Sequence, residues 1–413
     1  MISTDTPLSD AASKPSILDG MIRSQVLAKL SGLKHGCFTL AEADRMQTLG
    51  DPGAEHHGMI EISNPAFFSK TAFGGSVGAA ESYMDGDWRC ERLVDVMRLM
   101  IRNRDLLDGI EGGNARIKGW LMKTAHALKR NTLSGSRKNI AAHYDLGNPL
   151  FELFLDSRLM YSSAVFDRPG MTLEQASERK LQLICESLEL RDSDRLIEIG
   201  TGWGGMAIYA AKHFGCHVTT TTISRQQHEL AAARIQAEGL QDRITLLLND
   251  YRELDGRFDK LVSIEMIEAI GHQFQDTYFE KCASLLEPGG KALIQAITIE
   301  DHRYQQALDS VDFIKRHIFP GSYIPCVSSM VESAARAGHL RLLDLRDIGP
   351  SYAMTLNEWR RRFHARKSEV HALGYDKRFF RMWDFYLAYC EAGFLEQSIS
   401  DVHLLFGKQR YPS

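Results

Sequence analysis

Short apolar runs alternate with helical patterns along the part of the chain that follows residue 190. The runs have the length of buried strands and span residues 196–199, 217–222, 244–248, 260–265 and 291–297. The helical patterns between them span 206–214, 224–238 and 274–286. Alternating strands and helices predict a parallel sheet with helices on both faces, so we expect an α/β fold. Ligands of such sheets bind at the carboxyl ends of the strands, where the site should lie.

The pattern beyond these runs turns helical as far as Met330, with a break at Ile318-Phe-Pro-Gly321. This segment is long for a connection inside a sheet, so we expect it to cap the site. Two more strands, at 340–345 and 402–407, enclose helices at 355–371 and 377–397. The second helix carries a stripe of aromatic residues, which predicts either core packing or the wall of an apolar substrate channel.

The first part of the chain predicts a tail and a small domain. Residues 1–18 are rich in Ser, Asp, Thr and Pro, which indicates a disordered tail. Residues 19–110 contain a glycine turn signal at 74–78 and a helical pattern at 92–101, but no catalytic pattern. We expect a small lipid or interaction domain here. A basic linker helix at 111–140 and a catalytic domain at 141–413 would follow it.

The linker is unusual in its charge. Residues 114–138 include Lys123, Lys129 and Arg130 and contain no acid. The apolar residues, among them Trp120, fall on one helical face. A basic amphipathic helix is attracted to an anionic membrane surface, whereas the alternative is a solvated helix packed on its own protein. The sequence alone favours neither interpretation.

Composition narrows the function classes. The net charge is -4, which does not indicate a nucleic-acid binder. The 7 Cys residues form no Cys-x-x-Cys pair, so we expect reduced thiols in a cytoplasmic protein. No apolar run approaches the roughly 20 residues that span a bilayer, so any membrane contact should be peripheral. The pair His56-His57 has no Cys close by, so no metal site is expected.

The strand at 196–199 runs into Gly200-Thr-Gly-Trp-Gly-Gly205. Glycines at a strand-to-helix turn let the backbone approach a ligand, because they lack a Cβ and tolerate positive φ. A dinucleotide enzyme would also need an acid roughly 20 residues further on, but 219–224 contains none. Glu198 instead precedes the first glycine, where its carboxylate can pair with an ammonium group. This spacing resembles the first motif of the S-adenosylmethionine (SAM) methyltransferases.

Further motifs follow the order of one family. Those before the glycine turn are Glu81-Ser-Tyr-Met-Asp-Gly-Asp-Trp88, His143-Tyr-Asp145, Phe154-Leu-Asp156 and Tyr161-Ser162. Those after it are Thr222-Ile-Ser-Arg-Gln-Gln227, Asp250-Tyr-Arg252, Glu268-Ala-Ile-Gly271 and Ile318-Phe-Pro-Gly321. With residues 181–205, they make the chain from about Ser76 to its end resemble the cyclopropane-fatty-acyl-phospholipid synthases.

This resemblance implies a Rossmann-like class I SAM methyltransferase fold, with a mostly parallel seven-stranded sheet and a small N-terminal domain. It implies that a methylene group passes from SAM to the cis double bond of an unsaturated phospholipid acyl chain. The residues expected around SAM are Tyr161, Ser162, Glu198, Gly200, Gly202, Thr222, Ile223, Gln227, Tyr251 and Arg252. The family also holds bicarbonate as a base, in a pocket that would fall on Ser163, Glu268, Gln295, the backbone of Ile297, and Tyr352.

The resemblance implies a role for the groups in that pocket. Methyl addition to an alkene leaves a carbocation, and a base must then remove a proton from the new methyl group to close a ring. A bound bicarbonate can be replaced, whereas a protein carboxylate risks alkylation. Glu268 would orient the ion, Tyr352 would donate a hydrogen bond to it, and an apolar wall would exclude water. Glu265 is a rival carboxylate, expected on the same face of a helix as Glu268.

Two positions depart from the family pattern. Ser163 stands where many members have Cys, and Gln295 where many have His. Both side chains can hydrogen-bond to an oxyanion, but Gln cannot carry a positive charge. The affinity for bicarbonate and the product therefore stay open, and a methylene or methyl branch is the alternative to a ring.

Two other classes stay open on sequence alone. A small-molecule N-methyltransferase would share the fold but would need neither the basic linker nor the small domain. A non-catalytic lipid-binding protein would need neither the intact glycine motif nor Glu268. We expect the lipid methyltransferase, bound peripherally at the cytoplasmic membrane surface with an unsaturated phospholipid as partner. Whether it forms a homodimer stays open.

Overall fold

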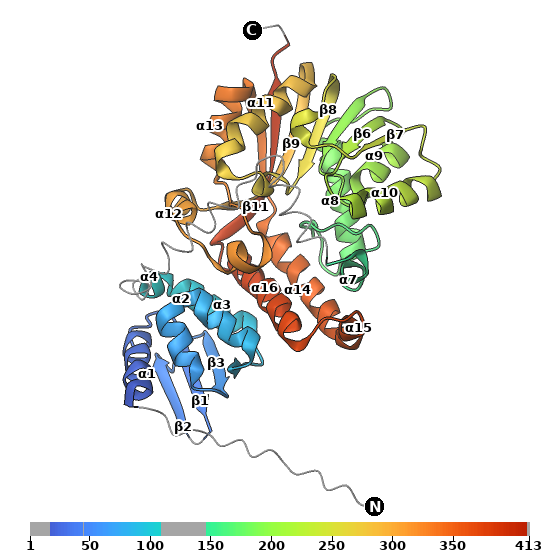
Figure 1. Cartoon of the computed structure of the whole chain (residues 1–413). Coiled ribbons are helices and arrows are strands. Elements are labelled where there is room, and N and C mark those ends of the chain that lie inside the picture. Colours follow the sequence, from blue (N-terminus) through green and yellow to red (C-terminus); the bar gives the residue numbers. More distant parts are fainter. Residues whose placement is uncertain (1–16, 44, 109–145, 411–413) are drawn as a thin grey trace, which may run out of the picture.

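The computed structural model describes residues 17–43, 45–108 and 146–410, which form a small domain and a larger α/β domain (Figure 1). Helix α1 begins at Ile17, inside the segment predicted as a tail. The rest of that tail and the predicted basic linker lie outside the described residues. Their assignments therefore stay predictions.

The small domain contains a four-stranded sheet in the order β2-β1-β3-β4. Its strands are β1 (Cys37–Glu42), β2 (Arg45–Gly50), β3 (His57–Ile62) and β4 (Trp88–Arg89). Its helices are α1 (Ile17–Leu30), α2 (Ala66–Asp85), α3 (Leu93–Arg102) and α4 (Arg104–Asp108). The sequence predicted α3 to within one residue but none of these strands. Strand β2, for example, is exposed at most positions and shows no apolar alternation.

The glycine segment predicted as a turn lies inside α2. Gly75 has φ 56° and ψ -141°, so the helix is broken there and two helical pieces meet at a kink. A Cβ on Gly78 would lie 2.0 Å from the carbonyl oxygen of Lys70, so only glycine permits the two pieces to approach this closely. The glycines therefore do change the direction of the chain, but they do so at a kink within a helix.

The larger domain contains a seven-stranded sheet in the order β10-β11-β9-β8-β5-β6-β7. Its strands are β5 (Arg195–Ile199), β6 (His217–Thr221), β7 (Ile244–Leu247), β8 (Phe258–Ile264), β9 (Leu286–Ile299), β10 (Leu340–Asp347) and β11 (Ile399–Lys408). Strands β5 to β9 pair in parallel, whereas β11 pairs antiparallel with both β9 and β10. The predicted mostly parallel, seven-stranded sheet is thereby confirmed.

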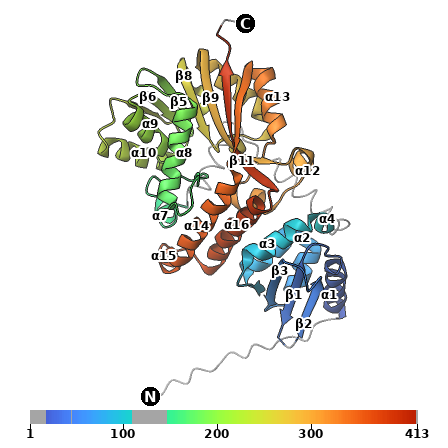
Figure 2. The same ribbon diagram turned by 180° about the vertical axis from the view of Figure 1, so that it is seen from behind.

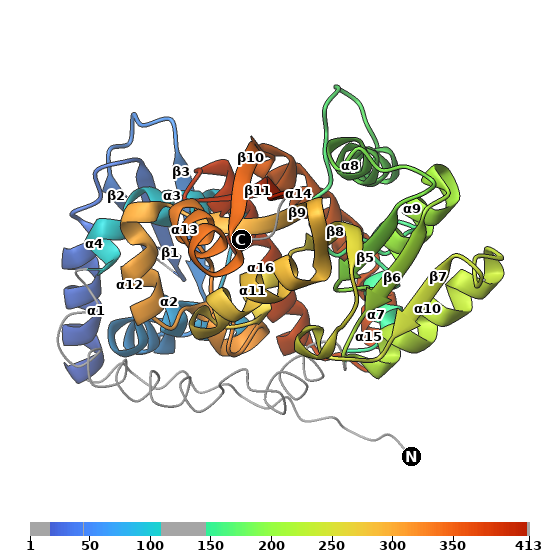
Figure 3. The same ribbon diagram turned by 90° about the horizontal axis from the view of Figure 1, so that it is seen from above.

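Helices cover both faces of this sheet (Figure 3). Successive side chains of β5 point to opposite faces of the sheet, since Leu196 packs in one buried cluster and Ile197 in another. The helices that join the Leu196 cluster are α8 (Leu173–Ser187), α9 (Gly205–Phe214) and α10 (Arg225–Ala237). Those that join the Ile197 cluster are α11 (Gln275–Leu285) and α13 (Val327–Gly338). The parallel strands are therefore buried on both sides, as their apolar runs predicted.

Helices from the C-terminal part lie between the sheet and the small domain (Figures 1 and 2). They are α14 (Gly349–Ala365) and α16 (Lys377–Leu395), and α15 (Lys367–Ala372) follows α14 at the end away from the small domain. The sequence predicted a single helix at 355–371, but α14 ends at Ala365 and α15 follows it. The shorter α7 (Asn148–Glu152), α12 (Tyr304–Asp309) and a π-helical turn (Ile314–Ile318) complete this layer.

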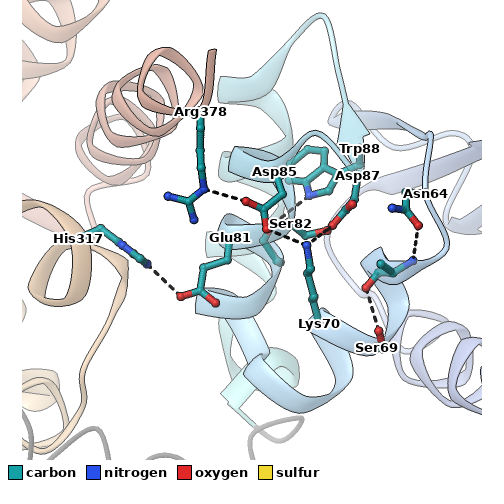
Figure 4. A network of polar contacts seen from close by, with 12 residues as sticks. Asn64, Ser69, Lys70, Glu81, Ser82, Asp85, Asp87, Trp88, His317 and Arg378 are labelled. Atoms are coloured by element: carbon teal, nitrogen blue, oxygen red, sulfur yellow. Dashed lines mark hydrogen bonds and ion pairs between the residues drawn. The ribbon is translucent and has the colours of Figure 1, made fainter. Parts of the chain in front are cut away.

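Side chains of the small domain bond directly to the larger domain. The Tyr83 hydroxyl of α2 donates to Asp384 of α16 at 2.8 Å, and both groups are buried. At the rim, Arg378 pairs with Asp85 at 2.8 Å, and His317 lies 3.1 Å from Glu81 (Figure 4). One apolar cluster also runs through both domains. The small domain is therefore fixed against α16.

Candidate active site

One large cavity, of about 680 Å³, lies where the parallel strands end. The glycine turn after β5 lines it, together with the ends of β6, β8 and β9. The segment at 303–324, predicted as a cap, forms part of its wall. Small-domain residues complete it and include Val26, Leu30, Phe38, Ile60, Phe67, Trp88, Met97 and Met100. Both domains therefore build one site.

The glycine turn has the backbone conformation that its sequence predicted. Gly200, Gly202 and Gly204 have φ values of 102°, 52° and 87°, a region that side chains disfavour. A Cβ on Gly202 would meet nothing within 4 Å, so the backbone there faces open space. Gly205 also lines the cavity, and it serves packing as well, because a Cβ there would lie 2.4 Å from the sulfur of Met160.

Glu198 lies at the cavity with a buried carboxyl group. Its Oε2 accepts a hydrogen bond from the Thr220 hydroxyl at 2.6 Å. Burial raises the pKa of Glu198 to about 8, although Thr220 and the charge of Lys180 oppose the shift. A cationic ligand group beside this carboxyl would favour its ionised form. The predicted pairing with an ammonium group is compatible with this geometry.

The end of β6 presents a short polar pair. The Thr222 hydroxyl donates to Oε1 of Gln227 at 2.9 Å, and both residues line the cavity with Ile223. Ser224 caps α10 by accepting from the backbone N–H of Gln227, which fixes the start of that helix. The threonine segment that lacks an acid thus places an amide and a hydroxyl at the cavity wall.

Tyr251 lines the cavity, but Arg252 does not lie among its lining residues. The Arg252 guanidinium binds both carboxylate oxygens of Asp250, at 2.8 and 2.7 Å. It also lies over the rings of Tyr251 and Phe274. The structure therefore gives Arg252 a role in holding the loop. Its predicted contact with adenine stays a prediction.

Tyr161 and Ser162 line the cavity beside the glycine turn. The Tyr161 hydroxyl lies 3.0 Å from that of Tyr386, and the Ser162 hydroxyl accepts from Nζ of Lys180 at 2.5 Å. Lys180 is wholly buried, and burial lowers its pKa. Sequence reasoning missed this lysine. The available signal was a cation on the apolar face of α8, between Ser177 and Leu181.

Glu265 is the centre of a buried hydrogen-bond cluster. Its Oε1 accepts from the backbone N–H of Ser163 and from the Gln295 side chain, each at 2.8 Å. Its Oε2 accepts from the Tyr352 hydroxyl, also at 2.8 Å. Burial raises the pKa of Glu265, and the charge of Lys180 opposes that shift. Three residues predicted to hold bicarbonate thus bond to one carboxylate.

Glu268 lies on the same cavity with a different partner. Its Oε1 accepts from the backbone N–H of Ile297 at 2.6 Å, and its buried Oε2 has no partner among the described residues. Burial, followed by the charge of Glu265, raises the pKa of Glu268 to about 8. The prediction that Glu268 and the Ile297 backbone lie together is met. Ser163, Gln295 and Tyr352 instead bond to Glu265.

The expectation that Glu265 and Glu268 share a helix face is wrong. Glu268 lies in a short 3-10 helix, Ile267–Ala269. Glu265 lies before it, directly after β8, with a left-handed φ of 48°. From this turn the Glu265 side chain bonds to Gln295 of β9 and to Tyr352 of α14.

A second layer behind Gln295 was also missed. The Gln295 amide donates to Asp401 at 2.8 Å as well as to Glu265, and its Oε1 lies 3.2 Å from Nε2 of His403. Burial, then the charge of Glu265, raises the pKa of Asp401 well above its usual range. Asp401 and His403 are in β11, near the end of the chain. No local motif links them to β8.

The residues that line this half of the cavity fit SAM. Open space above Gly202 leaves room for a ligand against the backbone, as a Cβ there would not. Glu198 offers a buried acid for an ammonium group, and Gln227 offers an amide for a hydroxyl. These groups come from the carboxyl ends of β5 and β6.

Known proteins share this architecture and sequence. A family model described as mycolic acid cyclopropane synthetase matches residues 131–404. The chain is 37% identical over 331 residues to the tuberculostearic acid methyltransferase UfaA1 of Mycobacterium tuberculosis, covering 78% of this chain and 76% of that protein. It is 35% identical over 356 residues to the cyclopropane-fatty-acyl-phospholipid synthase of Escherichia coli K12, covering 84% and 87%.

Solved structures agree. Mycolic acid cyclopropane synthase CmaA1, complexed with SAH and CTAB, superposes with a TM-score of 0.62 at 28% identity, covering 66% of this chain and 98% of that one. Coclaurine N-methyltransferase, bound to N-methylheliamine and SAH, superposes with a TM-score of 0.61 over 80% of this chain and 99% of that one. Its identity is 17%, so this second likeness concerns the fold alone.

Proposed function

Because the chain belongs to the mycolic acid cyclopropane synthetase family, it is a SAM-dependent methyltransferase, and we propose that its acceptor is an unsaturated phospholipid acyl chain. The proposed reaction adds a methylene group to a cis double bond and gives a cyclopropane fatty acid. The E. coli relative, which the chain matches over 87% of that protein's length, is named for this reaction.

One observation carries the choice of acceptor. The cavity that contains Glu198 and Gly202 continues between apolar side chains of α16 and of the small domain. From α16 these include Phe385, Tyr386 and Tyr389. A long hydrocarbon chain gains free energy by burial there, because apolar surface leaves water at about 25 cal/mol per Å². A small polar amine would leave most of this wall unused.

Different residues of the chain are assigned to SAM binding and to the exclusion of water. When bound, SAM supplies a methyl group activated by its sulfonium charge. We assign Glu198 to the ammonium group of SAM, Gln227 to its ribose and the glycine turn to the close approach of its backbone. The aromatic side chains exclude water, which would quench a carbocation, and their ring faces favour positive charge.

A second product class is supported by another relative. The protein at 37% identity is named a tuberculostearic acid methyltransferase, so a methyl-branched or methylene product is the alternative to a ring. The ring forms when the new methyl group loses a proton and the C–H electron pair closes onto the cationic carbon. A methylene branch forms when a hydride first shifts to the cationic carbon and the methyl group then loses its proton. A small-molecule N-methyltransferase has no comparable support, since the likeness to such an enzyme concerns the fold alone.

Two finer expectations keep the status of predictions. Bicarbonate as the base follows from the family resemblance, although the hydrogen bonds around Glu265 favour a side chain in that place. Peripheral binding to an anionic membrane depends on the basic linker, which lies outside the described residues. In the described part of the chain, no helix has the length and apolar character to cross a membrane.

The product decides between these functions. The chain is expressed in a bacterium that lacks its own synthase and is rich in cis-unsaturated phospholipid. Mass spectrometry of the fatty acids should show the added CH₂, and proton NMR should show ring protons upfield of all other lipid protons. Olefinic or methyl-branch signals without ring protons would favour the alternative product. Unmodified lipid despite SAM binding would refute the lipid acceptor.

A further inference from the structure

The carboxylate of Glu265 bonds to three of the five residues to which the family resemblance assigns an anion. Donors from three separate segments converge on it, namely the Ser163 N–H, the Gln295 amide and the Tyr352 hydroxyl. Neither Ser163 nor Gln295 lines the cavity, whereas Glu265 does. The carboxylate therefore stands between two of its donors and the space left for substrate.

The backbone supports a special role for this side chain. Glu265 has a φ of 48°, in the left-handed region where glycine is the unstrained residue. A non-glycine residue there costs free energy, and such strain is often found at functional sites. Glu265 is also held close to a buried cation, Lys180, whose charge opposes the cost of burying the carboxylate. Burial raises the pKa of this strained acid, which makes it a stronger base, and the charge of Lys180 limits the rise.

We propose that Glu265 is the base of the methylene transfer and replaces the bicarbonate ion predicted for this pocket. The inference rests on the proposed function. It makes the base part of the chain, so the enzyme needs no bound anion to act. Of the carboxyl groups in the cluster, only Glu265 combines several donors, a neighbouring cation and contact with the cavity.

The step balances in atoms and charge. The methyl group carries the positive charge of the sulfonium to the alkene, and S-adenosylhomocysteine leaves neutral at sulfur. One C–H bond of the new methyl group then breaks. Its electron pair forms the ring-closing C–C bond, and its proton passes to a Glu265 oxygen. The carbocation and the carboxylate charge disappear together, leaving a cyclopropane and a neutral carboxylic acid.

The hydrogen bonds to Glu265 also reduce the risk that the carbocation alkylates its carboxylate. Each oxygen of Glu265 already accepts at least one donor, which lowers its nucleophilicity toward carbon. Proton removal is therefore favoured over ester formation.

The decisive variants are Glu265→Gln and Glu265→Gly. Gln keeps the size but cannot take a proton, so kcat should fall at least about 100-fold, as is typical for loss of a general base. SAM affinity should stay within about 3-fold, because Glu265 contacts none of the groups assigned to SAM. Gly suits the left-handed backbone and leaves the three donors free. Formate or bicarbonate at millimolar concentration should therefore restore part of the Gly variant's activity.

The wild type provides the matched control for that rescue. Its rate in buffer stripped of carbon dioxide should not change when bicarbonate is added. A wild type that needs bicarbonate would overturn the proposal, and so would a Gln variant that keeps more than about a tenth of the wild-type kcat.

An anion-binding measurement tests Glu265 without any lipid. Calorimetry should detect formate binding to Glu265→Gly but not to the wild type, and adding Tyr352→Phe to the Gly variant should weaken it. Equal binding to wild type and Gly variant would overturn the proposal even if lipid were modified. Lack of any modified lipid would refute the proposed function, and the anion-binding result would still decide whether Glu265 fills an anion site.

Discussion

The two halves of the cavity are built in opposite ways. The half assigned to SAM consists mainly of backbone, a glycine turn between β5 and α9 with an open face at Gly202. The half around Glu265 consists of buried side chains from α8, β9, β11 and α14. Backbone sites depend on shape, whereas buried side-chain sites depend on charge balance. Substitutions should therefore impair the two halves through different measured quantities.

The largest expected effect is on the backbone half. Gly202→Val places a side chain in the open space and strains a φ of 52°, so SAM affinity should fall at least about 100-fold. Calorimetry with the purified protein measures this. Gly239→Val is the matched control, because Gly239 also has a positive φ and open space but lies outside the cavity. Equal SAM binding by both variants would contradict the assignment of the turn.

Lys180→Met should impair the side-chain half. The Lys180 cation lowers the pKa of Glu265, so its removal raises that pKa and leaves less carboxylate at neutral pH. Each unit of this rise costs about a tenfold fall in kcat below the new pKa. The acidic limb of the pH profile of kcat should therefore shift to higher pH. Lys212→Met, at an exposed ion pair with Glu238, should leave the profile in place.

Turnover should depend on the size of the side chain at position 268 more than on its charge. Its pKa of about 8 keeps it protonated at neutral pH, and Gln resembles a neutral carboxylic acid. Glu268→Gln should therefore keep kcat within about 5-fold, while Glu268→Ala should lose about 10- to 100-fold with SAM affinity nearly unchanged. A reverse order of the two variants in steady-state assays would show that Glu268 acts as an anion.

The smallest effect is a proton linkage at Glu198. With a pKa of about 8, Glu198 is mostly protonated before SAM binds and should ionise when the ammonium group arrives. Binding below pH 8 then releases a proton, and affinity should fall by up to about tenfold per pH unit as the pH is lowered. Calorimetry in buffers of different ionisation enthalpy measures this release. Glu198→Gln should abolish the buffer dependence, and wild-type heats independent of buffer would contradict the linkage.

The comparison also explains what the sequence could predict. The glycine turn, strands β5 to β8 and helices α9 to α11 follow local patterns of apolar residues and glycines, so their bounds were predicted to within about two residues. Strand β9 and helix α14 begin earlier in the chain than predicted. The Glu265 cluster joins segments separated by more than a hundred residues, such as Ser163 and Glu265 or Gln295 and Asp401. No periodicity encodes which buried donor meets which carboxylate. Glu265 was therefore noticed as an acid but assigned to a helix face.

The small domain shows a similar limit. Its short strands carry exposed residues, and β1 pairs in parallel with β3 across a connection that includes β2. Such long-range pairing leaves a weak local signal. The resemblance to a family extended into this domain through residues 81–88, but it did not predict that Val26 or Phe38 would line the cavity.

The shared apolar cluster has a consequence for how the protein unfolds. Ile22 and Phe38 of the small domain belong to the same buried cluster as Trp359 and Trp383 of the C-terminal helices. Loss of either domain would expose the other's share of that core, so their folding free energies are coupled. Heating should therefore melt both domains in one cooperative transition, with a calorimetric enthalpy close to the van't Hoff value.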